Sequence, residues 1–222
     1  MNISVIIPVY NEEKYIEPCL DAFKGQITPP DEIIIVDNNC HDKTIEKVKK
    51  YPVRIVQETT QGMTPARNKG FDVAHNEILA RCDADTHVSP TWVATLKEQF
   101  RDPDVVAVSG PVSFYDTKLS PILSHLHQWS YFRMGKLIFH HNMLFGPQYA
   151  LRRSAWEKIR TEICTDDSQV HEDMDITFHL SDCGFIVFSS QLAAGVSTRR
   201  AHSSSLYFEY PWRAIKTIWA HR

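Results

Sequence analysis

Ile3-Ser4-Val5-Ile6-Ile7-Pro8-Val9 is a short apolar run, rich in β-branched residues, near the start of the chain. A run of this kind is typical of a strand that is buried on both faces, as the strands of parallel sheets are. The next segment has its apolar residues at helical spacing until Gly25: Tyr15, Ile16, Cys19, Leu20 and Phe23. The stretch therefore predicts a strand followed by a helix.

The same alternation continues along the first half of the chain. It predicts strands at 32–37, 53–56, 77–82 and 105–108, and helices at 42–50, at 66–74 after the start signal Thr64-Pro65, and after Pro90. Repeated strand–helix units build mostly parallel sheets flanked by helices. We therefore expect an α/β fold with a Rossmann-like, mostly parallel central sheet.

The second half of the chain is less regular. Residues 111–145 are rich in aromatic residues and histidine and follow no strict period. Helical patterns return at 154–160 and 173–183, and 184–188 is a further strand candidate. No repeat or long linker divides the chain, so we expect a single domain over 1–222 with an irregular C-terminal half.

Composition and charge exclude several classes of protein. The chain has 222 residues, of which 43% are hydrophobic, and 24 Lys and Arg against 27 Asp and Glu give a net charge of −3. This composition excludes a disordered chain, and it lacks the basic excess of nucleic-acid-binding proteins. No apolar run approaches the roughly 20 residues of a membrane span, and the N-terminus turns acidic too early for a signal peptide. The five cysteines lack a C-x-x-C pair, which favours free thiols. We expect a cytoplasmic protein.

Polar side chains follow three of the predicted strands. The first strand ends in Tyr10-Asn11-Glu12, the second in Asp37-Asn38-Asn39, and the fourth in Asp83-Ala84-Asp85. Ligands of open parallel sheets bind outside the carboxyl ends of the strands, where these groups would gather. Each cluster alone is also an ordinary helix cap or turn, but three on one sheet edge indicate a binding site.

Asp83 and Asp85 have the spacing of a divalent-cation site. Two carboxylates one residue apart in a turn can converge on Mg²⁺ or Mn²⁺, which prefer a site completed by phosphate oxygens and water. The implied ligand is a nucleotide diphosphate, whose departure the cation would assist. The chain has no P-loop and no Gly-x-Gly-x-x-Gly, which argues against an ATPase and a dinucleotide-binding oxidoreductase.

Five motifs in order carry a resemblance to a known family: PVYNE, VDNN, QGMTPARNKG, CDADT and HEDMD. Together they resemble the family 2 glycosyltransferases, whose catalytic domain has the GT-A fold. The resemblance implies an inverting enzyme that uses a nucleotide-diphospho-sugar donor of UDP or GDP type and Mn²⁺ or Mg²⁺. It also implies a role in the biosynthesis of cell envelope polysaccharides, with a glycan or a lipid-linked acceptor.

The resemblance also implies roles for the matching residues of the donor site. Asp37 would accept a hydrogen bond from the base, and Arg67 would face the nucleotide. Asp83 and Asp85 would be the D-x-D pair, with Asp85 nearer the metal. The base and ribose pocket would be lined by Pro8, Tyr10 and Glu12.

The acids of HEDMD are the candidates for the catalytic base. Inverting transfer in one displacement needs a carboxylate that takes the proton of the acceptor hydroxyl. We assign this role to Asp173, with Glu172 as a catalytic partner and both Glu172 and Asp175 as rivals. Acids at a helix start also stabilise the helix dipole, which is the structural alternative.

Two further segments, one before HEDMD and one after it, complete the implied site. Gly146 and Gln148 resemble the acceptor side of the family, although Gly146 is equally well read as a turn glycine. Arg199 and Arg200 would hold the departing diphosphate, and His202 could complete the metal shell. The Gln-x-x-Arg-Trp motif of processive synthases is absent from the sequence, which favours single transfer.

The resemblance divides the expected domain into three parts. Residues 1–110 would bind the nucleotide-sugar, 111–205 would hold the acceptor and the base, and 206–222 would form an amphipathic helix. In that helix Trp212, Ile215, Ile218 and Trp219 recur at helical spacing among basic residues. They would either lie on the inner face of a membrane or pack on the domain.

The sequence leaves two alternative functions open. A sugar-1-phosphate nucleotidyltransferase would share the α/β plan, but it should have a Gly-rich basic loop where this chain has PVYNEEKY. A non-catalytic nucleotide-sugar-binding protein would not need the acids of HEDMD. The histidines His125 and His127, two positions apart, and the adjacent His140 and His141 could suggest zinc. Residues at i,i+2 on a helix do not face each other, however, and no acidic partner lies at the spacing of a zinc protease, so surface or hydrogen-bonded histidines are favoured.

Overall fold

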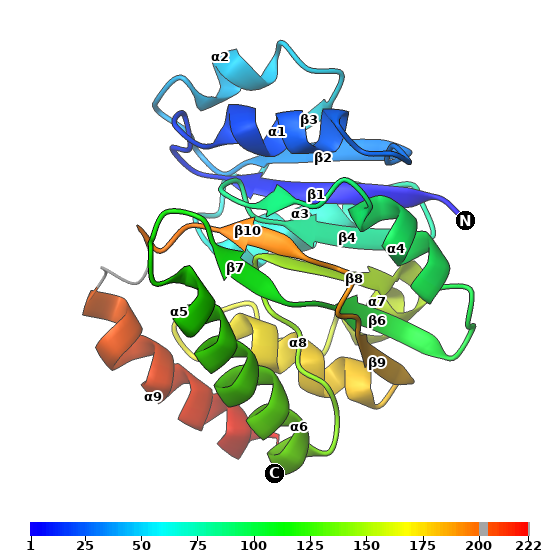
Figure 1. The fold of residues 1–222 in the computed structure, drawn as a ribbon, viewed down its shortest axis with the longest axis vertical. Helices are drawn as coiled ribbons and strands as arrows, with labels where there is room; N and C mark the ends of the chain where they lie inside the picture. The colour runs from blue at the N-terminus through cyan, green and yellow to red at the C-terminus, as the bar shows by residue number, and fades with distance from the viewer. Residues whose placement is uncertain (200–203, 222) are drawn as a thin grey trace.

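The computed structural model describes residues 1–199 and 204–221 and is built around a seven-stranded sheet (Figure 1). The strand order is β3-β2-β1-β4-β8-β6-β9. Their bounds are Ile3–Val9 for β1, Glu32–Asp37 for β2, Arg54–Gln57 for β3, Ile78–Cys82 for β4, Val105–Ser109 for β6, Gln148–Arg152 for β8 and Phe185–Phe188 for β9. The expected α/β fold is confirmed.

The buried strands of the first half lie as their apolar runs predict. Every residue of β1 is buried, and β1 pairs in parallel with β2 on one side and with β4 on the other. The register sets Val9 opposite Asp37, so the ends of β1 and β2 lie side by side. The connecting helices are α1 (Ile16–Lys24), α2 (Thr44–Val48), α3 (Met63–Val73) and α4 (Trp92–Gln99).

Strand β8 was not expected, and it lies inside the sheet between β4 and β6. It runs antiparallel to both of its neighbours, β4 and β6. The register sets Gln148 opposite Cys82, which brings the segment before β8 next to the end of β4. A segment far along the sequence therefore reaches the sheet edge where Asp83 begins.

The aromatic stretch forms a layer of its own outside the sheet. It contains β7 (Val112–Phe114), α5 (Ser120–His127), the π-helical turn η1 (Gln128–Arg133) and α6 (Met134–Phe139). Strand β7 joins a second sheet of order β5-β10-β7, with β5 at His87–Val88 and β10 at Ala194–Val196. Figure 1 shows α5 and α6 in front of α8 (Glu172–Ser181), while α7 (Arg153–Ile159) precedes α8 in the chain.

The C-terminal helix α9 (Ser204–Ala220) divides the predicted apolar stripe between two faces. Its inward side carries Ala214, Thr217 and Ile218, and Ala214 and Ile218 pack on a cluster with Phe132 and Met174. Three residues point outward and are exposed: Trp212, Ile215 and Trp219. The helix thus packs on the domain with one side and leaves two tryptophans on the surface. Among the described residues, no helix has the length and apolarity needed to cross a bilayer.

Candidate active site

Four acidic residues at or just after strand ends lie at one edge of the main sheet. Glu12 follows β1, and its backbone N–H donates to Thr44 Oγ1 at 2.7 Å. Asp37 ends β2, and its Oδ1 accepts the backbone N–H of Cys40 at 2.9 Å. The other two, Asp83 and Asp85, follow β4 and are both buried. The convergence follows from the parallel register, because these strands end at the same edge.

Arg199 joins two of these acids across the edge. Its Nη1 and Nη2 each donate to a carboxylate oxygen of Glu12 at 2.6 Å, and its Nε donates to Asp85 Oδ2 at 2.6 Å. The guanidinium also lies 4.3 Å from the ring centroid of Tyr15. A planar guanidinium with a bidentate carboxylate partner is strongly oriented. The structure therefore brings Glu12, Asp85 and Arg199 together.

Arg81 is a residue of the candidate site that the sequence motifs did not indicate. It lies in β4, is 1% exposed, and donates to Asp83 Oδ1 at 3.1 Å, to Glu172 Oε1 at 2.6 Å and to Asp173 Oδ1 at 3.2 Å. Arg81 thus links the D-x-D pair to the acids of HEDMD. A signal was present, since Arg81 is the one charged residue within the apolar run Ile78–Cys82. Buried charges of this kind need partners.

Glu172 is held by two arginines. Arg67, also buried, donates from Nη1 to Glu172 Oε2 at 2.5 Å, while Arg81 contacts the other oxygen. Burial alone would raise the pKa of Glu172, but the charges of Arg81 and then Arg67 outweigh it and lower the pKa to about 2. Glu172 is therefore ionised at neutral pH. Arg67 contacts this acid, whereas Arg199 contacts Glu12 and Asp85.

Asp173 has the opposite electrostatic character. Its Oδ2 accepts the backbone N–H of Gly146 at 2.8 Å, and it is 6% exposed. Burial and the neighbouring charge of Glu172 raise its pKa well above the usual range of an aspartate, although Arg81 acts in the opposite direction. Two adjacent carboxyls whose pKa values move apart are suited to different roles.

The third acid of HEDMD, Asp175, lies on another side of α8. Its Oδ2 accepts the backbone N–H of Cys164 at 2.9 Å, and its Oδ1 lies 3.0 Å from His221 Nε2. These contacts place Asp175 toward α9, because residues two apart on a helix point in different directions. The structure groups Glu172 and Asp173 and sets Asp175 apart.

The other residues predicted for the donor and acceptor sites differ in their exposure to solvent. Pro8 is buried within β1, and Tyr10 is 49% exposed just beyond it. Gln148 is fully buried: its amide donates to the carbonyls of Pro111 and Leu192, and its Oε1 accepts from Trp92 Nε1 at 2.6 Å. Arg200 and His202 lie outside the described residues.

Similarity to known proteins agrees with this geometry. A family model described as glycosyl transferase family 2 matches residues 4–160. Glycosyltransferase AglE of Haloferax volcanii is 32% identical over 120 residues, which are 50% of this chain and 40% of that protein. The chain spans about two fifths or less of the length of the first curated relatives that it matches.

Two solved structures share the fold. The mannosyltransferase PcManGT from Pyrobaculum calidifontis, in complex with GDP-Man and Mn²⁺, superposes with a TM-score of 0.76 at 21% identity, covering 99% of this chain and 63% of that one. S. aureus TarS 1–349, in complex with UDP-GlcNAc, superposes with a TM-score of 0.72 at 18% identity, covering 95% and 62%. The central fold is that of the GT-A glycosyltransferases.

Proposed function

Because this chain belongs to glycosyl transferase family 2, we propose that it transfers a sugar from a nucleotide-diphospho-sugar to an acceptor hydroxyl, with inversion and in a single displacement. The observation that carries the proposal is the network around Arg81. This one buried side chain connects Asp83, Glu172 and Asp173, so the D-x-D pair and the candidate base form one unit.

The donor would bind at the acidic sheet edge. Tyr10, Glu12 and Asp37 surround the ends of β1 and β2, where we place the base and ribose, with Pro8 behind them as part of β1. A donor of UDP or GDP type fits this proposal, since both nucleotides are bound by structural neighbours. Arg199 reaches the same edge and would hold the departing diphosphate, and we propose the same role for Arg200.

Mn²⁺ or Mg²⁺ fits the donor set at Asp83 and Asp85. Both are carboxylates, and hard divalent cations prefer oxygen ligands together with phosphate and water. We propose Asp85 as the nearer ligand and His202 as a further one. Asp83 would keep its contact with the buried Arg81, whereas the contact of Asp85 with Arg199 would be replaced when the metal binds. When bound, the cation would neutralise charge on the leaving diphosphate.

Asp173 would act as the base. The acceptor oxygen attacks the anomeric carbon while the bond between that carbon and the diphosphate breaks. The proton of the attacking hydroxyl passes to Asp173. A raised pKa makes this carboxylate the stronger proton acceptor of the pair, once ionised. Glu172, held by Arg67 and Arg81, would position the arginines and keep Asp173 oriented. Gly146 would contribute by its backbone, and Gln148, whose amide is fully engaged, would support the acceptor side from within the sheet.

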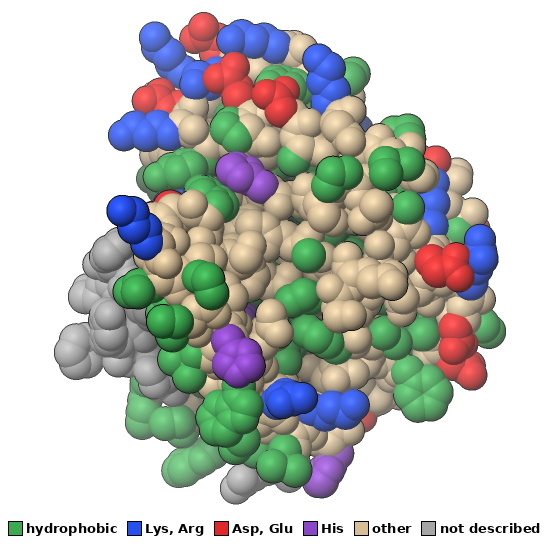
Figure 2. All heavy atoms as spheres, viewed as in Figure 1, with side chains coloured by type: hydrophobic (Ala, Val, Ile, Leu, Met, Phe, Trp, Pro, Cys, Tyr) green, Lys and Arg blue, Asp and Glu red, His purple; other side chains and the backbone are tan. Residues whose placement is uncertain are grey.

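The acceptor would approach over the aromatic layer. Exposed large hydrophobic residues gather there: Leu119, Ile122, Leu126, Trp129, Leu137 and Ile138, joined by Trp212, Ile215 and Trp219 of α9. Figure 2 shows hydrophobic side chains with basic ones among them over this part of the molecule. Exposed apolar helices with tryptophan and basic residues are suited to a lipid surface. We therefore propose peripheral membrane contact and a lipid-linked or glycan acceptor, in the biosynthesis of cell envelope polysaccharides.

Donor hydrolysis without acceptor tests the proposal. The chain is incubated with a panel of UDP- and GDP-sugars and Mn²⁺, and release of nucleotide diphosphate is measured. We expect release from one donor class, with loss of release in Asp85→Asn. Formation of nucleoside triphosphate from pyrophosphate would instead identify a sugar-1-phosphate nucleotidyltransferase. Donor binding without any release, even with acceptors, would identify a binding protein.

A further inference from the structure

A carboxylate and two imidazoles meet where α8 contacts α9. His221 Nε2 lies 3.0 Å from Asp175 Oδ1, and His179 Nε2 lies 3.9 Å from the same oxygen. One ligand atom from each of the three residues lies within 4.8 Å of the others. Asp175 is 4% exposed, and both histidine side chains are 18% exposed. None of these three residues has a part in the proposed transfer reaction.

The fold places the three residues together for clear local reasons. Asp175 and His179 are separated by four positions on α8, so they lie on one face of the helix. His221 follows the last residue of α9, whose Thr217 Oγ1 accepts the backbone N–H of His171 at 2.8 Å. This contact holds the end of α9 against the beginning of α8, and it brings the imidazole of His221 to Asp175.

We propose that Asp175, His179 and His221 bind Zn²⁺, which fastens α9 to α8. Zinc bonds of about 2.0–2.1 Å in a tetrahedral site place ligand atoms about 3.4 Å apart. The observed distances of 3.0 and 3.9 Å lie on either side of that value. Water would complete the shell.

Two outer contacts support a metal site. The Nδ1 of His179 lies 3.6 Å from Glu162 Oε2, on the opposite side of the ring from Asp175. A carboxylate at the second nitrogen of a histidine is the usual device that fixes a zinc ligand. Likewise, Asp175 uses one oxygen for the Cys164 N–H and directs the other at the histidines. The orientation of Asp175 is therefore set by a hydrogen bond from outside the cluster, and Glu162 lies where it could accept the second N–H of His179 after a small shift.

The proposed site differs in chemistry from the acidic sheet edge. Two nitrogens and one oxygen favour Zn²⁺, whereas a site of carboxylates and phosphate favours Mg²⁺ or Mn²⁺. The zinc site also has a separate structural effect. It would anchor the helix that exposes Trp212 and Trp219 to the helix that begins with Glu172 and Asp173. Zinc would bind these three residues whether or not the chain transfers a sugar.

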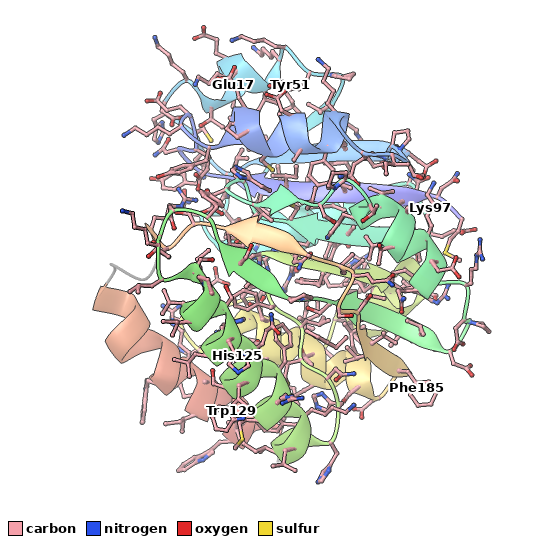
Figure 3. The ribbon with its side chains drawn as sticks, in the orientation of Figure 1. Glu17, Tyr51, Lys97, His125, Trp129 and Phe185 are labelled. Carbon is pink, nitrogen blue, oxygen red and sulfur yellow. The ribbon has the colours of Figure 1, made fainter. Side chains whose placement is uncertain are left out.

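Zinc titration tests the inference. The full chain with Asp85→Asn, stripped of metal, is titrated with Zn²⁺ in competition with a chromophoric chelator. We expect one tightly bound equivalent, lost in His179→Ala and in His221→Ala. His125→Ala is the matched control, because His125 lies on the exposed side of α5 beside Trp129 (Figure 3), and it should retain the equivalent. The proposal would be overturned if the His221→Ala chain bound as many zinc equivalents as the chain that keeps His221. Displacement of Zn²⁺ by a hundredfold excess of Mn²⁺ would overturn it as well.

A spectroscopic measurement separates metal binding from misfolding of a variant. Co²⁺ substituted into the unaltered site should give the intense visible absorption of a tetrahedral ion with nitrogen ligands. Added Zn²⁺ should bleach that absorption at one equivalent and raise the midpoint of thermal unfolding. A spectrum typical of octahedral, fully hydrated Co²⁺ would show that the three side chains only hydrogen-bond to one another.

Discussion

Gly146 donates its backbone N–H to Asp173 Oδ2 at 2.8 Å, so the residue before Pro147 holds the carboxylate that we propose as the base. A Cβ on Gly146 would lie 2.7 and 2.9 Å from the two oxygens of Asp173, closer than ordinary van der Waals contact. Arg81 fixes the same carboxylate from the sheet side. Asp173 therefore has little room to move away.

Gly146→Ala is expected to impair catalysis more than folding. The added methyl group displaces the Asp173 carboxylate, and small misplacements of a reacting group cost roughly 10²-fold in rate. The measurement is kcat with the active donor, together with the thermal unfolding midpoint. Gly25→Ala is the control, because a Cβ there would meet its nearest atom at 3.5 Å. Unchanged kcat in Gly146→Ala would show that the methyl group is accommodated away from Asp173.

Asp173→Asn should lower kcat by roughly 10²–10⁴-fold, the usual contribution of a positioned base. Asn has nearly the same shape, so the KM for the donor should change little. Asp182→Asn, an exposed substitution just after the same helix, serves as the control. A loss of only a few fold in Asp173→Asn would remove Asp173 from the base role.

The pH profile should report the pair of acids. Activity should fall as the pH drops through the raised pKa of Asp173, because the protonated group cannot accept a proton. Glu172→Gln removes a negative charge that raises this pKa, so the acidic limb of kcat/KM should move to lower pH. If the acidic limb of kcat/KM does not move in Glu172→Gln, a group other than Asp173 controls it.

Stability should depend on pH through Glu172. Its pKa is about 2 in the folded chain against an ordinary 4.5, so its contribution is fully present above pH 4.5 and is lost as the pH falls toward 2. The shift corresponds to about 3 kcal/mol of unfolding free energy. The gap in unfolding free energy between the unaltered chain and Glu172→Gln should therefore narrow over that range, measured by urea denaturation. A gap that is constant with pH would contradict this prediction.

Membrane binding should depend on the exposed tryptophans. Replacing Trp129, Trp212 and Trp219 together by Ser should reduce co-sedimentation with anionic vesicles at least several fold, since each loses apolar area in the interface. Phe185→Ser is the control, because Phe185 is 67% exposed but lies on β9, away from Trp129 (Figure 3). Equal vesicle binding by all three proteins would exclude the membrane surface.

The strands of the first half were predictable because each is a continuous apolar run. Strand β8 was not, since Gln148–Arg152 contains no β-branched residue and its interior position depends on pairing with β4 and β6. The acids of the site were visible as motifs, but their partners were not. Arg81 acquires its role only when α8 packs beside β4, and Asp175 is separated from Asp173 only by the geometry of the helix.

Arg199 gives the acidic sheet edge a resident counter-ion. Its guanidinium satisfies Glu12 and Asp85, which come from positions 187 and 114 residues earlier in the chain. A divalent cation that binds Asp85 through Oδ2 would take the place of this guanidinium rather than enter a pocket that carries only negative charge. Donor loading would then be an ion exchange, in which a released Arg199 becomes available to the diphosphate at the moment when the metal arrives.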